Sequence, residues 1–131
     1  MDEVSTKRLS GVHPDLVAVV KLAFAKLPAD LSFRVTEGLR TKDRQAKLVA
    51  SGASRTMNSR HLTGHAVDLV ALTDYDGDGK MEVRWDWPLY YRLADAMLSA
   101  AAELEVPVVW GGSWRTFPDG PHFELDRRQY P

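Results

Sequence analysis

Residues 59–68 read Ser-Arg-His-Leu-Thr-Gly-His-Ala-Val-Asp and place an imidazole, His61, seven residues before a carboxylate, Asp68, across a turn that contains glycine. The segment 66–72 is apolar apart from Asp68 and predicts a strand. Neighbouring side chains of a strand lie on opposite faces, so Asp68 faces away from the two apolar residues beside it. A carboxylate in such surroundings is costly to bury unless it is paired or binds a metal. We therefore expect His61 and Asp68 to face one cavity.

A second segment, residues 118–125, carries His122 directly after a Pro-Asp-Gly-Pro turn. On a neighbouring strand, His122 supplies a third metal ligand. Catalytic zinc sites use three such N or O ligands and leave a fourth position for water, whose pKa falls to about 7. Cysteine is absent, so a metal site has to use His, Asp and Glu. Asp119, three residues before His122, is placed to act on that water as the general base.

The remaining pattern predicts an α+β domain in which a small antiparallel sheet carries the zinc site and packs against helices. Apolar residues at helical spacing predict helices at 14–27 and from Pro88 to about 104. The stripe of the second helix contains Leu89, Leu93, Ala96, Met97, Ala100 and Leu104. A Thr41 cap predicts a short helix that runs to about residue 50. Further strands are expected at 31–36, 106–110 and 122–125. Loops are expected at 52–59, 73–80 and 111–121.

The composition limits the classes of protein. A chain of 131 residues fits one domain, residues 1–131, and 44% hydrophobic with 27% charged residues is typical of a packed globular protein. The formal charge of -1 makes no global field for nucleic acid, so we expect no nucleic-acid partner. The start of the chain lacks the pattern of a signal peptide, and no apolar run reaches the roughly 20 residues of a membrane span.

Taken together, the two segments resemble the zinc D-Ala-D-Ala carboxypeptidase and L-alanyl-D-glutamate endopeptidase family of cell-wall peptidases. The shared pattern is Ser-x-His-x-x-Gly-x-Ala-x-Asp followed by a late acidic residue and His, and the resemblance runs from residue 38 to residue 125. It implies zinc ligation by His61, Asp68 and His122, with Asp119 as the catalytic base. It also implies that Arg40 binds substrate, the alternative being a structural salt bridge. Ser59 either touches substrate or stabilises the turn.

The resemblance is strongest to bacteriophage endolysins and implies a peptidoglycan-degrading zinc metallopeptidase that hydrolyses the L-alanyl-D-glutamate bond of the murein stem peptide. In the segment Asp119-Gly120-Pro121-His122, the acidic residue before the histidine is an aspartate, and this favours that bond. Two alternatives stay open: a D-alanyl-D-alanine carboxypeptidase or dipeptidase with the same metal site, and a non-catalytic, metal-dependent wall-binding module. We expect a monomer whose partner is peptidoglycan, made in the host cytoplasm and acting on the cell wall after release.

Residues 74–80, Asp-Tyr-Asp-Gly-Asp-Gly-Lys, reproduce the first half of a calcium-binding loop, with oxygen ligands at alternate positions and glycine at the sixth. The twelfth position is Trp85 rather than Glu, so we expect weak binding or a further acidic ligand. The candidate calcium ligands are Asp74, Asp76, Asp78, Lys80 and Glu82, with Asp86 as an alternative to Glu82. The competing interpretation is a solvated acidic turn.

Other polar and aromatic residues have two interpretations each. His65 and Asp68 are three residues apart, so on an extended strand their side chains lie on opposite faces, and we expect His65 to point away from the metal. Glu124 has the parity of His122 and either orients that ligand or replaces Asp119 as the base. The aromatic residues Trp110, Trp114 and Phe117 either line a substrate groove or pack in the core.

Overall fold

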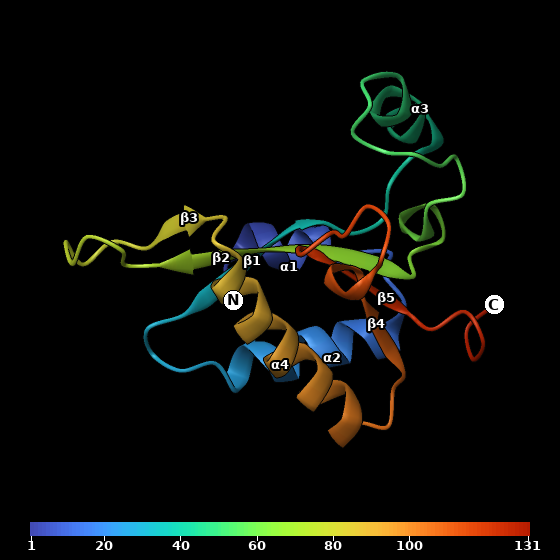
Figure 1. Cartoon of the computed structure of the whole chain (residues 1–131). Helices are drawn as coiled ribbons and strands as arrows, with labels where there is room; N and C mark the ends of the chain where they lie inside the picture. The colour runs from blue at the N-terminus through green and yellow to red at the C-terminus, as the bar shows by residue number, and fades with distance from the viewer.

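The computed structural model describes residues 1–131 as an antiparallel sheet with two helices packed against one face (Figure 1). The strand order is β1-β2-β5-β4, and β3 pairs with β2 beyond this path. The strands are β1 (Ser32–Glu37), β2 (Ala66–Thr73), β3 (Glu82–Arg84), β4 (Val108–Trp110) and β5 (His122–Leu125). The helices are α1 (Glu3–Arg8), α2 (Pro14–Ala25), α3 (Lys42–Ala50) and α4 (Trp87–Glu103), with short 3-10 turns η1 (Arg60–Thr63) and η2 (Gly111–Ser113).

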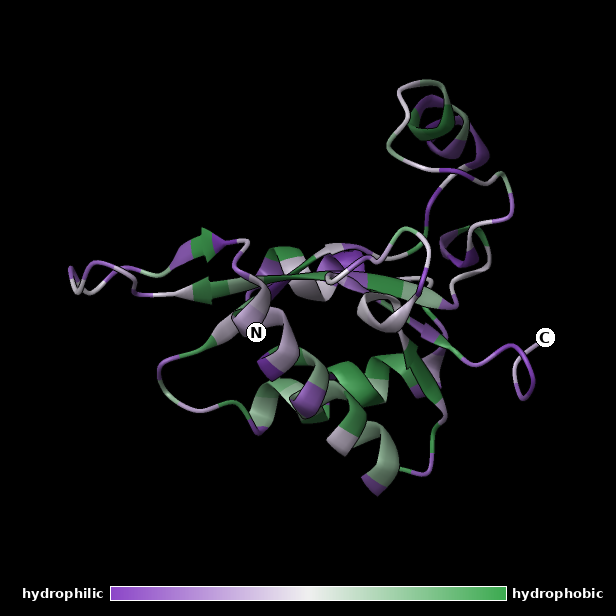
Figure 2. Cartoon of the chain, viewed as in Figure 1, coloured by the Kyte–Doolittle hydropathy of each residue, from purple (hydrophilic) through white to green (hydrophobic).

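The hydrophobic core lies between the sheet and the pair α2 and α4, whose apolar sides face each other and the strands (Figure 2). Strand alternation decides which residues enter this core. On β2, Val67, Leu69 and Ala71 belong to it, and on β5 Phe123 and Leu125 do. The intervening polar residues therefore point to the opposite face, where α3 projects away from the sheet (Figure 1). None of the helices has both the length and the apolar character needed to cross a membrane.

The sequence predictions of the main elements are confirmed to within about two residues at most ends, and the α+β class with an antiparallel sheet is confirmed. Thr41 caps α3 as predicted, because its hydroxyl accepts a hydrogen bond from the backbone N–H of Arg44. The predicted stripe of α4 is partly wrong. Tyr90, Ala94 and Ala101 are buried together with Leu93, Met97 and Ala100, while Leu104 is 40% exposed just beyond the end of the helix.

Tyr90 explains the shift of the buried stripe. Its ring lies in the core, and its hydroxyl accepts a hydrogen bond from the Ala71 backbone N–H and donates one to the carbonyl of Arg84. A tyrosine hydroxyl that both accepts and donates a hydrogen bond leaves no unpaired polar group in the core. This contact also fixes the start of α4 against the β2–β3 hairpin. Two short elements, α1 and β3, were not predicted.

Candidate metal and active site

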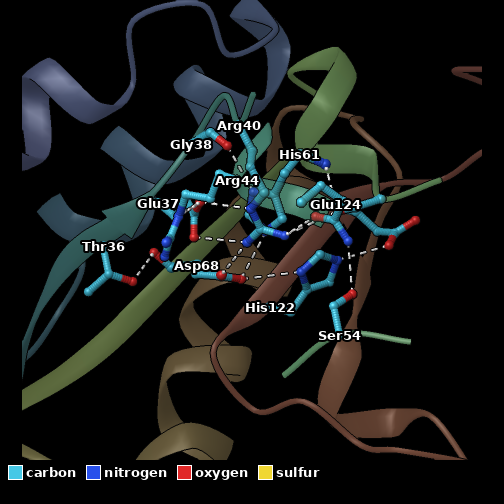
Figure 3. Close-up of polar contacts among 12 residues, drawn as sticks. Thr36, Glu37, Gly38, Arg40, Arg44, Ser54, His61, Asp68, His122 and Glu124 are labelled. Atoms are coloured by element: carbon cyan, nitrogen blue, oxygen red, sulfur yellow. Dashed lines mark hydrogen bonds and ion pairs between the residues drawn. The ribbon is translucent and has the colours of Figure 1, made fainter. Parts of the chain in front are cut away.

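The three predicted metal ligands meet on the face of the sheet opposite α2 and α4 (Figure 3). Asp68 of β2 and His122 of β5 are direct partners in the strand register, and His61 comes from η1. One carboxylate oxygen, Asp68 Oδ1, lies 3.2 Å from His61 Nε2 and 3.2 Å from His122 Nδ1. The ligand atoms all lie within 4.8 Å of one another, and both histidines are buried.

The turn before β2 determines where His61 points. The hydroxyl of Ser59 caps η1 by accepting from the His61 backbone N–H, and Gly64 ends η1 with a left-handed φ of 74°. A Cβ at Gly64 would also come within 2.4 Å of the Gly11 carbonyl oxygen, so glycine is required on both counts. The ring Nδ1 of His61 then lies 2.8 Å from the Gly38 carbonyl oxygen, which can only accept a hydrogen bond. His61 therefore carries a proton on Nδ1 and directs Nε2 at Asp68.

His122 is oriented in the opposite sense by Glu124, two residues further along the same face of β5. The ring Nε2 lies 2.9 Å from Glu124 Oε1 and donates to it, which leaves Nδ1 facing Asp68. The predicted orienting role of Glu124 is supported by this contact. Metal-bound histidines usually donate their other ring N–H to a carbonyl or carboxylate, and both histidines do so here.

The donor set fits a zinc ion. With bonds of about 2.0–2.1 Å, the ligand atoms of a tetrahedral zinc ion lie roughly 3.4 Å apart, close to the 3.2 Å between each imidazole and Asp68. Burial opposes ionisation of Asp68, but the hydrogen bonds from His122 and His61 outweigh it and hold its pKa far below the usual range. Burial also disfavours the charged form of His122, yet Asp68 and Glu124 raise its pKa to about 9. A divalent cation can replace the protons held between these groups.

A β-bulge brings an additional carboxylate to this face. The register runs from Val35 opposite Leu69 to Glu37 opposite Asp68, so two residues of β1 span one of β2. The extra residue reverses the alternation, and Glu37 points toward the site although Phe33 and Val35 face the core. The sequence interpretation missed Glu37, because a bulge shifts side-chain parity without a clear sequence signal.

Arg40 is 8% exposed at its side chain and is held by several partners. Its Nε and Nη2 donate to the two oxygens of Glu37 at 2.7 and 2.8 Å, and Nη1 donates to Gln45 Oε1 at 2.7 Å. Nη2 also lies 3.6 Å from Asp68 Oδ2. These are the contacts of the salt-bridge alternative, and they make Arg40 a positioning group for Glu37 and Asp68. Substrate contact by Arg40 or Ser59 stays a prediction.

Asp119 lies at the same cavity as the three ligands. The cavity has a volume of about 430 Å³, and its lining includes His61, Asp68, Asp119 and His122. The Asp119 backbone N–H donates to the Gly111 carbonyl at 2.9 Å, which fixes the turn before β5. Burial, and after it the charge of Asp68, raises the pKa of the Asp119 carboxyl. A half-buried carboxylate with a raised pKa beside the ligands suits the predicted base.

The aromatic residues divide between core and cavity. Trp114 and Phe117 line the cavity, and the Trp114 ring lies 5.0 Å from the His122 ring. Trp110 is a core residue instead, with its indole N–H donating to the Gly120 carbonyl at 2.7 Å. His65 contacts Thr63 and the ring of His13 and is not part of the metal cluster.

The acidic loop also gathers possible ligands. Oxygen atoms of Asp74, Asp76 and Asp78 lie within 4.8 Å of one another, and Asp74 Oδ1 is buried without a hydrogen-bond partner. Glu82 is not part of this group, although the neighbouring charge of Asp76 raises the pKa of its carboxyl. The remaining contacts are hydrogen bonds from backbone N–H groups of residues 78–80 to the three aspartates. Calcium binding stays a prediction.

This α+β domain gathers the donor atoms of His61, Asp68 and His122 at one cavity, the kind of donor set that catalytic metal sites use. The chain belongs to the phage L-alanyl-D-glutamate peptidase family, whose sequence profile matches residues 1–130. It is 38% identical over 96 residues to an L-alanyl-D-glutamate peptidase of Listeria phage A118, an alignment that covers 73% of this chain but only 31% of that relative. Its fold matches the crystal structure of the L-Ala D-Glu endopeptidase ChiX of Serratia marcescens with a TM-score of 0.86 and 46% identity, over 100% of this chain and 92% of that one.

Proposed function

We propose that this protein is a zinc-dependent endopeptidase that hydrolyses the L-alanyl-D-glutamate bond of the peptidoglycan stem peptide. The observation that carries the proposal is the convergence of His61, Asp68 and His122 on one point of an open cavity, with both histidines oriented from outside. The names of the family and of both relatives support the choice of bond.

The roles of the residues follow from their positions. When bound by His61, Asp68 and His122, zinc polarises a carbonyl group and lowers the pKa of water. Asp119 accepts the proton of the attacking water and passes it to the leaving amine of glutamate. Arg40 and Glu37 keep Asp68 in place from the β1 side of the cavity.

The direct test uses purified protein and Gram-negative murein. Mass spectrometry of the digest should show new glutamyl amino termini, chelation should abolish them, and added zinc should restore them. Release of terminal D-alanine would instead identify a carboxypeptidase or dipeptidase. Murein affinity without new amino termini would identify a wall-binding module.

Substitution of the base separates metal binding from chemistry. D119A should keep stoichiometric zinc but lose about 10²- to 10⁴-fold in turnover, the usual contribution of a general base. D119N tests the same role with little change of volume. Turnover near that of the parent in both variants would move the base role to another group, with Glu124 as the first candidate.

A further inference from the structure

Two loops contact each other in the wall of the cavity that also contains the predicted metal ligands. Arg55, in the loop after α3, places its guanidinium carbon 4.7 Å from the centre of the Phe117 ring, in the loop between η2 and β5. Both residues line the cavity and both are exposed, Phe117 by 46%. Phe117 has a φ of 56°, which bulky residues rarely adopt. The pair therefore presents a cation on the cavity wall.

Arg55 differs from the other three arginines that line the cavity. Arg40 is bound to Glu37, Arg127 lies 3.6 Å from Glu124, and Arg60 donates to the backbone carbonyls of Leu125 and Tyr130. Arg55 forms no ion pair and no hydrogen bond within the chain, and its one specific contact is the Phe117 ring. All five of its N–H donors are available to a ligand in the cavity.

Of the four carboxylates in the lining, three are paired within the protein, and Asp119 is the exception. Glu37 is bound by Arg40 and Arg44, and Glu124 by His122 and Arg127. A substrate carboxylate that enters the cavity therefore meets in Arg55 an exposed guanidinium with neither an ion pair nor a hydrogen bond. Arg60 also lacks a carboxylate partner, but backbone carbonyls hold its guanidinium. Guanidinium groups bind carboxylates through two parallel hydrogen bonds, and stacking on an aromatic ring leaves that fork free.

We propose that Arg55, held over Phe117, binds the free carboxylate of the substrate's glutamyl residue and makes the enzyme selective for glutamate over its amide. The inference rests on the proposed function and deepens it. The stem peptide continues from glutamate through only one of its two carboxyl groups, so the other stays ionised beside the scissile nitrogen. An amide at that position removes the charge and turns an acceptor atom into a donor that faces the guanidinium.

The test is a comparison of two substrates and three variants. Matched stem peptides carry the glutamyl group either as the free acid or as the carboxamide. The parent enzyme should prefer the acid by about tenfold in kcat/KM, the effect of a charge-assisted hydrogen bond, with most of the difference in KM. R55Q should bring this ratio close to one by slowing only the acid substrate. R55K should lie between them, because a lysine retains charge but loses the fork.

R115Q is the matched control, because Arg115 lies in the Phe117 loop, is exposed and does not line the cavity. It removes the same charge and should leave the ratio unchanged. An R55Q ratio equal to that of the parent, or an equal loss for both substrates, would overturn the proposal. Calorimetry of both peptides with zinc-loaded D119A measures the same preference without turnover. The subsite is therefore tested even if the parent cleaves neither peptide, a result that would overturn only the proposed function.

Discussion

Single hydrogen bonds from outside the cluster set the direction of both histidine ligands. Gly38 orients His61 through its backbone carbonyl, and that position admits no side chain, because a Cβ there would lie 2.1 Å from the Arg8 carbonyl oxygen. Glu124, a residue that is 7% exposed, orients His122 through its carboxylate. A side-chain orienting group can be replaced by mutation, whereas a backbone carbonyl cannot.

Removal of the Glu124 carboxylate should weaken metal binding without unfolding the protein. We expect E124A to lower zinc affinity about 10- to 100-fold, as loss of such orienting contacts usually does. E124Q should fall between the parent and E124A, because its amide oxygen still accepts from His122 without the negative charge. Competition with a chromophoric chelator measures the affinities.

The control for this series is E3A, which removes an exposed carboxylate from α1. Turnover at saturating zinc distinguishes the two roles considered for Glu124. An orienting residue loses activity only when zinc is limiting, whereas a base would lose it at all zinc concentrations. Unchanged zinc affinity in E124A would contradict the orienting role.

At the scale of elements, the two-residue periodicity of strands made most of the site predictable. The apolar residues on either side of Asp68 and His122 show which face of each strand enters the core, so both polar side chains lie on the other face. Their proximity could therefore be predicted once the two strands were paired. The position of Glu37 at the site could not be predicted from the sequence, because the bulge in β1 depends on the pairing with β2. The burial of Gln45 could not be predicted either. Gln45 is fully buried because the α3 connection folds over it, and such a tertiary contact has no local signal in the sequence.

The short helix α1 depends on its cap. Asp2 accepts from the Ser5 backbone N–H at 2.8 Å and pairs with Arg34 at 2.9 Å, and the Ser5 and Arg34 hydrogen bonds lower the pKa of Asp2 to about 2 from 3.8. The ionised form thus stabilises the fold above the unfolded value of 3.8, and this contribution is lost as the pH falls through about 2.

D2A should therefore lower the free energy of unfolding by about 1 kcal/mol at neutral pH, the usual effect of losing a cap. The deficit should shrink between about pH 4 and pH 2. Urea unfolding of metal-free protein across this range measures it, and D2N separates the charge from the cap. A deficit that is constant with pH would show that the Asp2 charge contributes nothing.

The β2–β3 hairpin contains the predicted calcium loop. The loop begins directly after β2, six residues after Asp68. If residues 74–82 bind calcium, millimolar calcium should raise the melting temperature of the parent, and magnesium should raise it less because it demands a stricter octahedral geometry. A D76N/D78N variant should lose the response. Equal responses in parent and variant would identify the loop as a solvated acidic turn. The measurement is a thermal melt of zinc-saturated protein, so that calcium cannot act through the His-Asp-His cluster.

At the scale of the whole molecule, the metal site joins parts of the chain that are distant in sequence. Asp68 and His122 are 54 residues apart, and η1, β2 and β5 each supply one ligand. The unfolded chain has no such site, so the free energy of zinc binding adds to that of folding. By contrast, α3 supplies no ligand and projects from the sheet (Figure 1).

Zinc should therefore stabilise the molecule, and the elements that supply the ligands should be stabilised more than α3. At zinc 100-fold above the dissociation constant the gain is about 2.7 kcal/mol, which for a domain of this size raises the melting temperature by roughly 10 °C. Amide hydrogen exchange should slow in η1, β2 and β5, with little change in α3. H122A provides the control and should lose both effects while keeping the far-ultraviolet spectrum of the parent. If H122A were stabilised as strongly as the parent, zinc would be acting elsewhere on the protein, and the three ligands would not form the site.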